Sequence, residues 1–129
     1  SSSGMTLLLR LLINAAALWV AASFIDGIRY TGRWPALVGL ALVFGAVNTF
    51  IRPVLSFFSF PITLLTLGLF TLVINALMLM LTAWIALRLG IPFAVDGFVP
   101  ALLGGICVSL VSMLLSAVLI SDKDGRVDE

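Results

Sequence analysis

Residues 67–87 read LGLFTLVINALMLMLTAWIAL, a run of 21 positions without a charged side chain. At about 1.5 Å of rise per residue, such a run forms a helix of roughly 30 Å, which is the thickness of the hydrocarbon core of a bilayer. The run is continuous and does not alternate between apolar and polar positions, so it favours a helix over a strand of a membrane barrel. This stretch therefore predicts a membrane-spanning helix.

Three further runs have the same character and cover residues 7–25, 35–51 and 98–120. Arg10 is the one charge inside them, and it lies close enough to the start of its run to snorkel to the headgroups. The chain of 129 residues is 62% apolar and only 10% charged, whereas a soluble domain is roughly 25% charged. The sequence therefore predicts an all-α membrane protein, with four transmembrane helices in a single domain over residues 5–120.

The flanking residues and the loops bear on orientation. Residues 1–4 are interpreted as a cloning remnant ahead of Met5, and residues 121–129 as a polar, mobile tail. With four spans, both termini and the central connection share one side of the membrane. The positive-inside rule favours cytoplasmic termini by a narrow margin. Four basic residues lie on the side of the termini and three on the other: Arg10, Arg52, Lys123 and Arg126 against Arg29, Arg33 and Arg88.

Two pairs of short segments indicate an internal repeat. LLINA at 11–15 resembles LVINA at 72–76, and PALVG at 35–39 resembles PALLG at 100–104. The offsets of 61 and 65 differ only by loop length, so each unit would be a helical hairpin that enters the membrane from the same side. Two such units predict a parallel repeat, with a pseudo-twofold axis along the membrane normal. Chance similarity is the alternative, because the alphabet of apolar segments is small.

Each predicted span carries small and polar residues at steps of three and four, the spacing that keeps side chains on one helix face. Two interpretations stay open. The stripes can serve close helix packing, for which membrane helices use small and hydroxyl-bearing residues. They can also line a water-accessible path after the protein oligomerises. The candidate residues for these roles are Asn14, Asn48, Thr71, Asn75, Gly105, Ser109, Ser112 and Ser116.

The central connection, residues 52–63, reads RPVLSFFSFPIT and is too apolar for an aqueous loop. It predicts a short amphipathic segment that lies in the membrane interface or re-enters the bilayer. Pro53 is expected to start a helix or kink one, and Pro61 to end it. Arg52 is expected to contact phospholipid headgroups by snorkelling or to stand at a pore mouth. The polar face of the segment consists of Arg52, Ser56, Ser59 and Thr63.

Groups that carry catalysis are scarce in this chain. It has no histidine, and its six acids are Asp26, Asp96 and four in the tail, so no pair of carboxylates lies within a span. The sequence shows neither a glycine-rich phosphate loop nor a cluster of metal ligands. We therefore expect no enzyme activity, no cofactor and no small-molecule substrate. A net charge of +1 also argues against a nucleic-acid partner.

The region around the central connection carries a family resemblance. NTFIRPVL at 48–55, FPITLLTLGLF at 60–70 and INAL at 74–77 resemble the pattern of a bacterial four-span family, the mycobacterial-type phage holin superfamily IV or YvlD family. The resemblance extends over residues 7–120. It implies a multi-pass protein of the bacterial cytoplasmic membrane that contacts lipid, self-associates and opens a pore or lesion. The alternative is a non-lytic scaffold or envelope-stress component that binds lipid or a partner protein.

Overall fold

The computed structural model describes residues 2–128, and the side-chain surroundings of residues 4–119. Within this part the chain forms six helices and two short strands. In chain order they are α1 (Ser2–Phe24), β1 (Ile28–Tyr30), α2 (Trp34–Phe50), α3 (Arg52–Phe58), α4 (Phe60–Leu65), α5 (Phe70–Arg88), β2 (Phe93–Val95) and α6 (Phe98–Asp128).

Four helical stretches are long and apolar enough to cross a membrane, and they confirm the predicted all-α, four-span architecture. The second stretch is longer than predicted, because the helix continues past Ile51 into α3. The helix α6 also continues through the charged residues that follow its apolar part. The four stretches are Gly4–Phe24, Trp34–Phe58, Phe70–Arg88 and Phe98–Leu119.

A bend separates α2 from α3, but helical hydrogen bonds run through it. The Ile51 amide donates to the carbonyl of Val47 at 2.8 Å, and the Leu55 amide donates to that of Ile51 at 3.1 Å. Pro53 lies in the first turn of α3 and has no N–H to donate, which accounts for the bend. Its predicted role is therefore consistent with the structure.

Pro61 lies two residues after Ser59, the C-cap of α3, and in the first turn of α4. The break of the helix at Ser59 is consistent with the predicted role of Pro61, since proline commonly follows the end of a helix. Proline is tolerated at such positions because the first amides of a helix have no helical acceptor. The chain then reverses at Leu67 and Gly68, which both have positive φ, 57° and 91°. The Gly68 amide closes the turn on the carbonyl of Thr63 at 2.8 Å.

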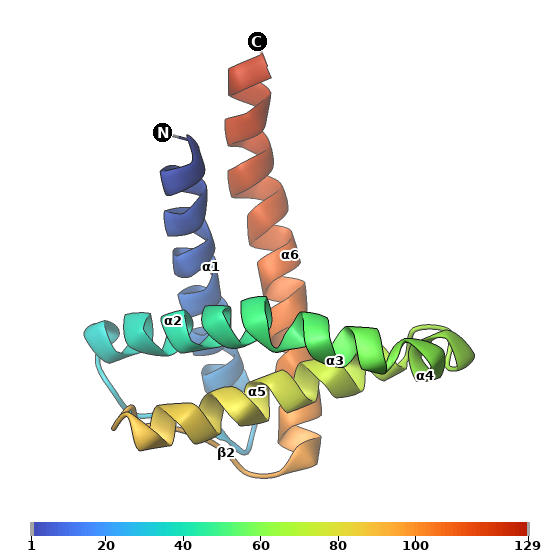
Figure 1. Ribbon diagram of the computed structural model, residues 1–129. Helices are drawn as coiled ribbons and strands as arrows, with labels where there is room; N and C mark the ends of the chain where they lie inside the picture. Colours follow the sequence, from blue (N-terminus) through green and yellow to red (C-terminus); the bar gives the residue numbers. More distant parts are fainter. Residues whose placement is uncertain (1, 129) are drawn as a thin grey trace.

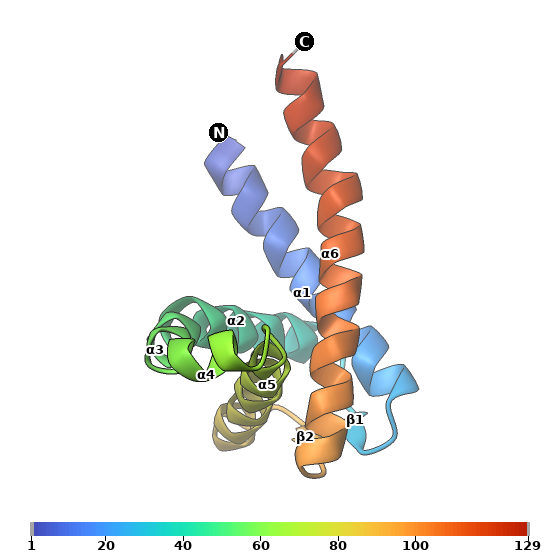
Figure 2. The same cartoon turned by 90° about the vertical axis from the view of Figure 1, so that its right-hand side faces the viewer.

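The long helices form two antiparallel pairs that cross each other. In Figure 1, α1 and α6 stand upright, while α2–α3 and α5 run across the view; Figure 2 shows the second pair nearly end-on. The strands β1 and β2 lie near the corner where the two pairs meet. Both chain ends lie at the far end of the upright pair, and α4 lies at the far end of the other pair. The two helix pairs therefore extend in different directions from the region of the strands.

The strands pair with each other in an antiparallel ribbon that the sequence did not predict. The paired residues are Ile28 with Val95, Arg29 with Ala94, and Tyr30 with Phe93. An offset of 65, which relates the two PAL segments, also relates 28–30 to 93–95. The flanking hydrogen bonds obey the same offset: Thr31 donates to Pro92 at 3.2 Å, and Asp96 donates to Gly27 at 2.7 Å. This register is the one expected for two hairpins related by a twofold axis through the ribbon.

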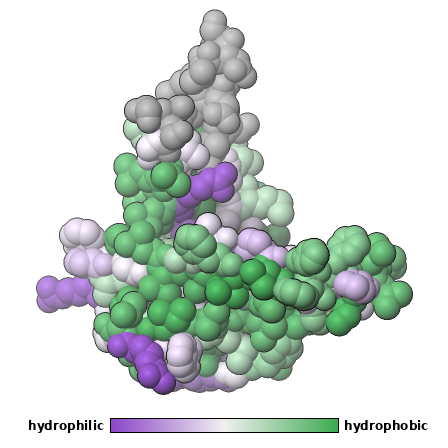
Figure 3. Space-filling view, viewed as in Figure 1, coloured by the Kyte–Doolittle hydropathy of each residue, from purple (hydrophilic) through white to green (hydrophobic). Residues whose placement is uncertain are grey.

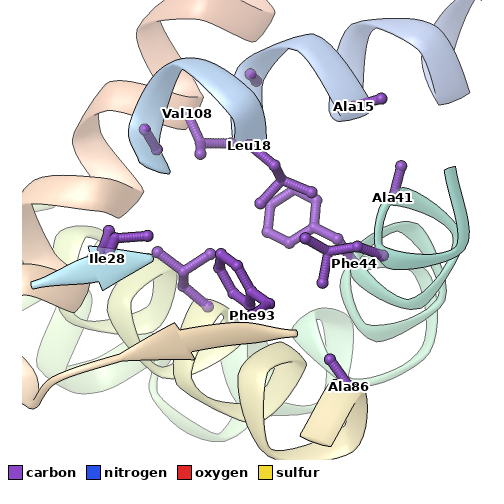
Figure 4. Close-up of a cluster of buried hydrophobic side chains, with 12 residues drawn as sticks. Ala15, Leu18, Ile28, Ala41, Phe44, Ala86, Phe93 and Val108 are labelled. Carbon is purple, nitrogen blue, oxygen red and sulfur yellow. The ribbon is translucent and has the colours of Figure 1, made fainter. Parts of the chain in front are cut away.

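The apolar core surrounds the ribbon and draws on every long helix (Figure 4). Ile28 and Phe93 come from the two strands, and Leu18 and Phe44 come from α1 and α2; all four are buried. On the side of α6, a side chain at Gly104 would collide with Ile28 and would lie 2.8 Å from Leu79. The absence of a side chain there lets α6 approach the ribbon and α5 closely.

Candidate functional site

A groove of about 850 Å³ opens between α1, α2 and α6. Figure 3 shows hydrophilic atoms in the angle between the upright helices and α2, within a largely apolar face. The polar and small residues on its lining belong to the stripes predicted from the sequence. From α1 they are Arg10 and Asn14, from α2 and α3 Gly45, Asn48 and Arg52, and from α6 Ser109, Ser112 and Ser116.

Helical periodicity explains why each helix presents several of these residues together. Asn48 and Arg52 are four positions apart, and Ser109, Ser112 and Ser116 follow at steps of three and four, so each set lies on one face. The crossing of the helices then directs three such faces at one space. The groove is thus built from three of the four predicted stripes.

Arg52 is held by a chain of side-chain hydrogen bonds at the edge of this groove. Its Nε donates to Asn48 Oδ1 at 2.8 Å, and its Nη2 donates to Asn75 Oδ1. Asn48 Nδ2 in turn donates to the Phe44 carbonyl at 2.8 Å, and Asn75 Nδ2 donates to Ser109 Oγ at 3.1 Å. The chain of bonds joins α2 and α3 to α5 and α6, so it fixes the guanidinium relative to both hairpins.

Arg52 does not stand at the end of an apolar helical stretch, as the predicted bounds of the second span implied. The predicted span ended at Ile51, which placed Arg52 near the headgroups. In the structure Arg52 is half-buried and lies inside the apolar stretch Trp34–Phe58, with α3 continuing beyond it. A charged side chain within a span needs partners. Two amide oxygens take that part here, rather than a carboxylate.

The remaining candidate residues fall outside the groove. Gly105 is buried against Asn75, and a side chain there would lie 3.1 Å from Asn75 Cβ and 3.2 Å from its carbonyl carbon. Thr71 is exposed in the first turn of α5. On α3 and α4, Ser56 is exposed, and Ser59 and Thr63 are half-buried. Of the predicted polar face of residues 52–63, the groove therefore includes Arg52 but not these three residues.

The ribbon carries an ion pair that was not predicted. Arg29 on β1 makes a two-pronged contact with Asp96 just after β2, with Nη2 at 3.0 Å from Oδ1 and Nη1 bonded to Oδ2. The hydrogen bond from Arg29 to Asp96 raises the pKa of the guanidinium above its ordinary value. Burial raises the pKa of the neighbouring Tyr30, whose hydroxyl donates to the Arg33 carbonyl. The repeat offset of 65 residues relates the loop that contains Arg29 to the loop that contains Asp96. It was the one feature of the sequence that could have indicated that these two loops meet.

Three tryptophans lie toward the ribbon end of their helices, with much of each side chain exposed. Trp19 lies in the last third of α1, Trp34 begins α2, and Trp84 lies in the last turns of α5. The Arg88 guanidinium stacks over the Trp84 ring, 4.6 Å from its centroid. Indole rings prefer the boundary between lipid and water, so these positions are those expected if the ribbon end lies near one membrane surface.

Comparison with known proteins places the chain in a family. The family described as "Mycobacterial 4 TMS phage holin, superfamily IV" matches residues 5–114. A protein of Streptomyces coelicolor, described as uncharacterised, is 49% identical over 117 residues, covering 87% of this chain and 94% of the relative. The uncharacterised membrane protein YvlD of Bacillus subtilis is 37% identical over 105 residues, covering 81% and 85%. No solved structure matches.

These matches confirm the resemblance inferred from residues 48–77. The chain belongs to the mycobacterial four-span phage holin family, superfamily IV. It is a small multi-pass protein of a bacterial membrane, similar over most of its length to YvlD.

Proposed function

We propose that this protein is a non-catalytic, holin-type component of the cytoplasmic membrane whose copies associate and open a pore or lesion. The supporting observation is the groove. A stripe used only for packing within one copy would be covered by a neighbouring helix. Here polar faces of α1, α2 and α6 border an open volume of about 850 Å³ instead. Polar side chains are costly in lipid, and association of copies through their grooves would give them water and polar partners.

The proposal includes an orientation with both termini in the cytoplasm and the ribbon outside. The termini and α4 lie at the ends of the helix pairs that point away from the ribbon (Figure 1). This arrangement supports the predicted division of the loops between two sides of the membrane. The count of basic residues, four against three, then favours the termini side as the cytoplasmic one.

Permeabilisation is tested by inducing the gene in bacteria while following dye entry and viability, and by leakage from vesicles that contain the purified protein. We expect dye entry within the induction period. Ser112→Val removes a hydroxyl from the groove lining and should reduce leakage, whereas Thr71→Val, outside the groove, should not. Continued growth without dye entry at full expression would contradict the proposal.

One feature favours the alternative of a non-lytic scaffold that binds lipid. The short helices α3 and α4 project beyond the crossing of the helix pairs (Figure 1) and expose mainly apolar side chains. This projection suits insertion into lipid and needs no pore. Growth without leakage, combined with retention in the membrane that depends on this segment, would support the alternative. The exposed large apolar side chains of α3 and α4 are Val54, Phe57, Phe58, Phe60, Ile62, Leu64 and Leu65.

A further inference from the structure

We propose that the groove binds an anionic phospholipid, whose phosphate contacts Arg10 and Arg52. The inference concerns one copy of the protein and does not require that copies form a pore. Its basis is the combination of two guanidinium groups and apolar walls in one open space, with no acid among the described residues of the lining.

The positive charge of the groove is not balanced by the described residues that line it. Arg10 and Arg52 both lie on the lining, and none of the described residues that line it is acidic. The described acids of the spans and loops, Asp26 and Asp96, lie in the connections at the ribbon end. The two amides that partner Arg52 carry no charge, so its positive charge is not balanced by them. A charge held inside a span is costly, and an anion in the groove would balance it.

Arg52 is positioned to bind such an anion. An arginine has five N–H groups in a planar fork, and Asn48 and Asn75 accept from two of the nitrogens, Nε and Nη2. These two amides hold the guanidinium without neutralising it, because their oxygens are uncharged. The donors that remain suit the oxygens of a phosphate, which guanidinium binds in a two-pronged manner. Arg10 supplies a second cation from α1.

The walls of the groove favour a lipid over a free phosphate. Leu7 and Leu8 of α1 and Leu42 of α2 line it with exposed apolar side chains. A water molecule takes up about 30 Å³ in the liquid, so an ion of a few times that size fills only a small part of the 850 Å³. A headgroup with the upper part of its acyl chains would fill the polar floor and cover the apolar walls together.

The test uses the purified full chain in a neutral detergent, with native mass spectrometry to count bound lipid. Phosphatidylglycerol is titrated against phosphatidylcholine of the same acyl chains, and sodium phosphate is titrated alone. We expect retention of phosphatidylglycerol in preference to phosphatidylcholine. Arg10→Gln should weaken phosphatidylglycerol binding about fivefold, which corresponds to the roughly 1 kcal/mol that one basic residue contributes near an anionic surface.

Arg52→Gln should weaken binding by a similar factor, and Arg52→Lys by less, since lysine keeps the charge but not the fork. Arg10 takes no part in the hydrogen bonds that Arg52 makes to Asn48 and Asn75. The Arg10→Gln variant therefore still tests the proposal if Arg52→Gln does not fold. The matched control is Arg33→Gln, an exposed arginine beside the ribbon and outside the groove.

Three results would overturn the proposal. The first is equal retention of the two lipids by the wild type. The second is a loss of phosphatidylglycerol with Arg33→Gln as large as with Arg10→Gln. The third is binding of inorganic phosphate that depends on Arg10 while phosphatidylglycerol binding does not, which would make this a site for a small anion. Leakage assays play no part here, so failure of the pore proposal would leave these measurements intact.

Discussion

The guanidinium of Arg52 donates a hydrogen bond to the side-chain oxygen of Asn75, and this contact ties the bend between α2 and α3 to the first half of α5. Asn75 passes the connection on to Ser109 of α6 at 3.1 Å. The α1–α2 hairpin and the α5–α6 hairpin are thus joined by a chain of polar side chains that lies within otherwise apolar helices. The groove and its arginine are held in place by residues of both hairpins.

Replacing Asn75 with alanine should destabilise the protein more than the same change at Asn14, its counterpart at the offset of 61. Asn75 makes two side-chain hydrogen bonds to other helices, whereas Asn14 lines the groove. Interhelical hydrogen bonds in membranes contribute about 0.6 kcal/mol each on average, so we expect a loss of about 1 kcal/mol. Thermal unfolding in lipid or mild detergent measures it. Equal melting temperatures for the two variants would show that this polar chain does not hold the hairpins together.

Asn75→Asp should preserve the fold but weaken the binding of anionic lipid. The new carboxylate would accept from Arg52 in place of the amide and would neutralise it. We expect phosphatidylglycerol binding to fall about as far as in Arg52→Gln, roughly fivefold. Thr71→Asp places an acid on the same helix at an exposed position with no hydrogen bond to Arg52 among the described residues, and it should leave binding unchanged. Undiminished binding by Asn75→Asp would argue that Arg52 does not contact the phosphate.

Gly105→Leu should separate α6 from α5 and lower stability. Even the Cβ of the new side chain would lie 3.1 Å from Asn75 Cβ and 3.2 Å from a backbone carbon that cannot move aside without shifting α5. Overpacking of this kind costs about 1–3 kcal/mol, and it would also disturb the bond from Asn75 to Ser109. Leu103→Ile, at an exposed position on the same helix, is the control. Indistinguishable stability in detergent would rule out close packing at Gly105.

Asp96→Asn should loosen the ribbon without unfolding the spans. The ion pair with Arg29 is exposed, at 59% and 47% for the two side chains, so solvent screening keeps its effect on global stability small. The local effect should appear as faster hydrogen exchange at the Thr31 and Asp96 amides, which bond across the ribbon. Asp26→Asn, in the same region but not paired with Arg29, is the control. Unchanged exchange in Asp96→Asn would show that the ribbon does not depend on the ion pair.

Cysteine labelling should place the ribbon outside the cell. In a Cys107→Ala background, Thr31→Cys should react with a membrane-impermeant reagent on intact cells, because Thr31 is exposed directly after β1. Ser3→Cys should react only after the cells are opened. The reverse labelling pattern would invert the proposed orientation, and labelling of both positions from outside would indicate a mixed population.

Several features of the fold could be read from local sequence, and others could not. The four spans and the bend at Pro53 follow from hydropathy and from the missing amide of proline. The second apolar helix was expected over residues 35–51, whereas the helical stretch continues to Phe58 and includes Arg52. The Arg52 guanidinium donates there to Asn48 and Asn75, and the contact with Asn75 could not be read from the local sequence. Pro61 follows the end of α3, as expected, but the sequence did not show that it would also open a further helix, α4.

The ribbon was missed for a different reason. Each strand has three residues, too short a segment for alternation to be detected, and its partner lies 65 residues away. The pair is stabilised by backbone bonds between two loops, which no single window of sequence contains. Only the offset of 65 between the two repeats, added to residues 28–30, would have identified residues 93–95 as the equivalent segment.

The sequence by itself determined that four segments lie in lipid and which face of each helix is polar. Both properties are local, since an uncharged run of about 20 residues matches the hydrocarbon core and the helical period places residues three and four apart on one face. Only the tertiary structure decided that the faces of α1, α2 and α6 border one groove, and that Arg29 meets Asp96, 67 positions away. Those contacts depend on how the helices cross and how the loops pair. The crossing and the pairing result from many weak contacts between distant segments, such as the approach of α6 at Gly104 and Gly105.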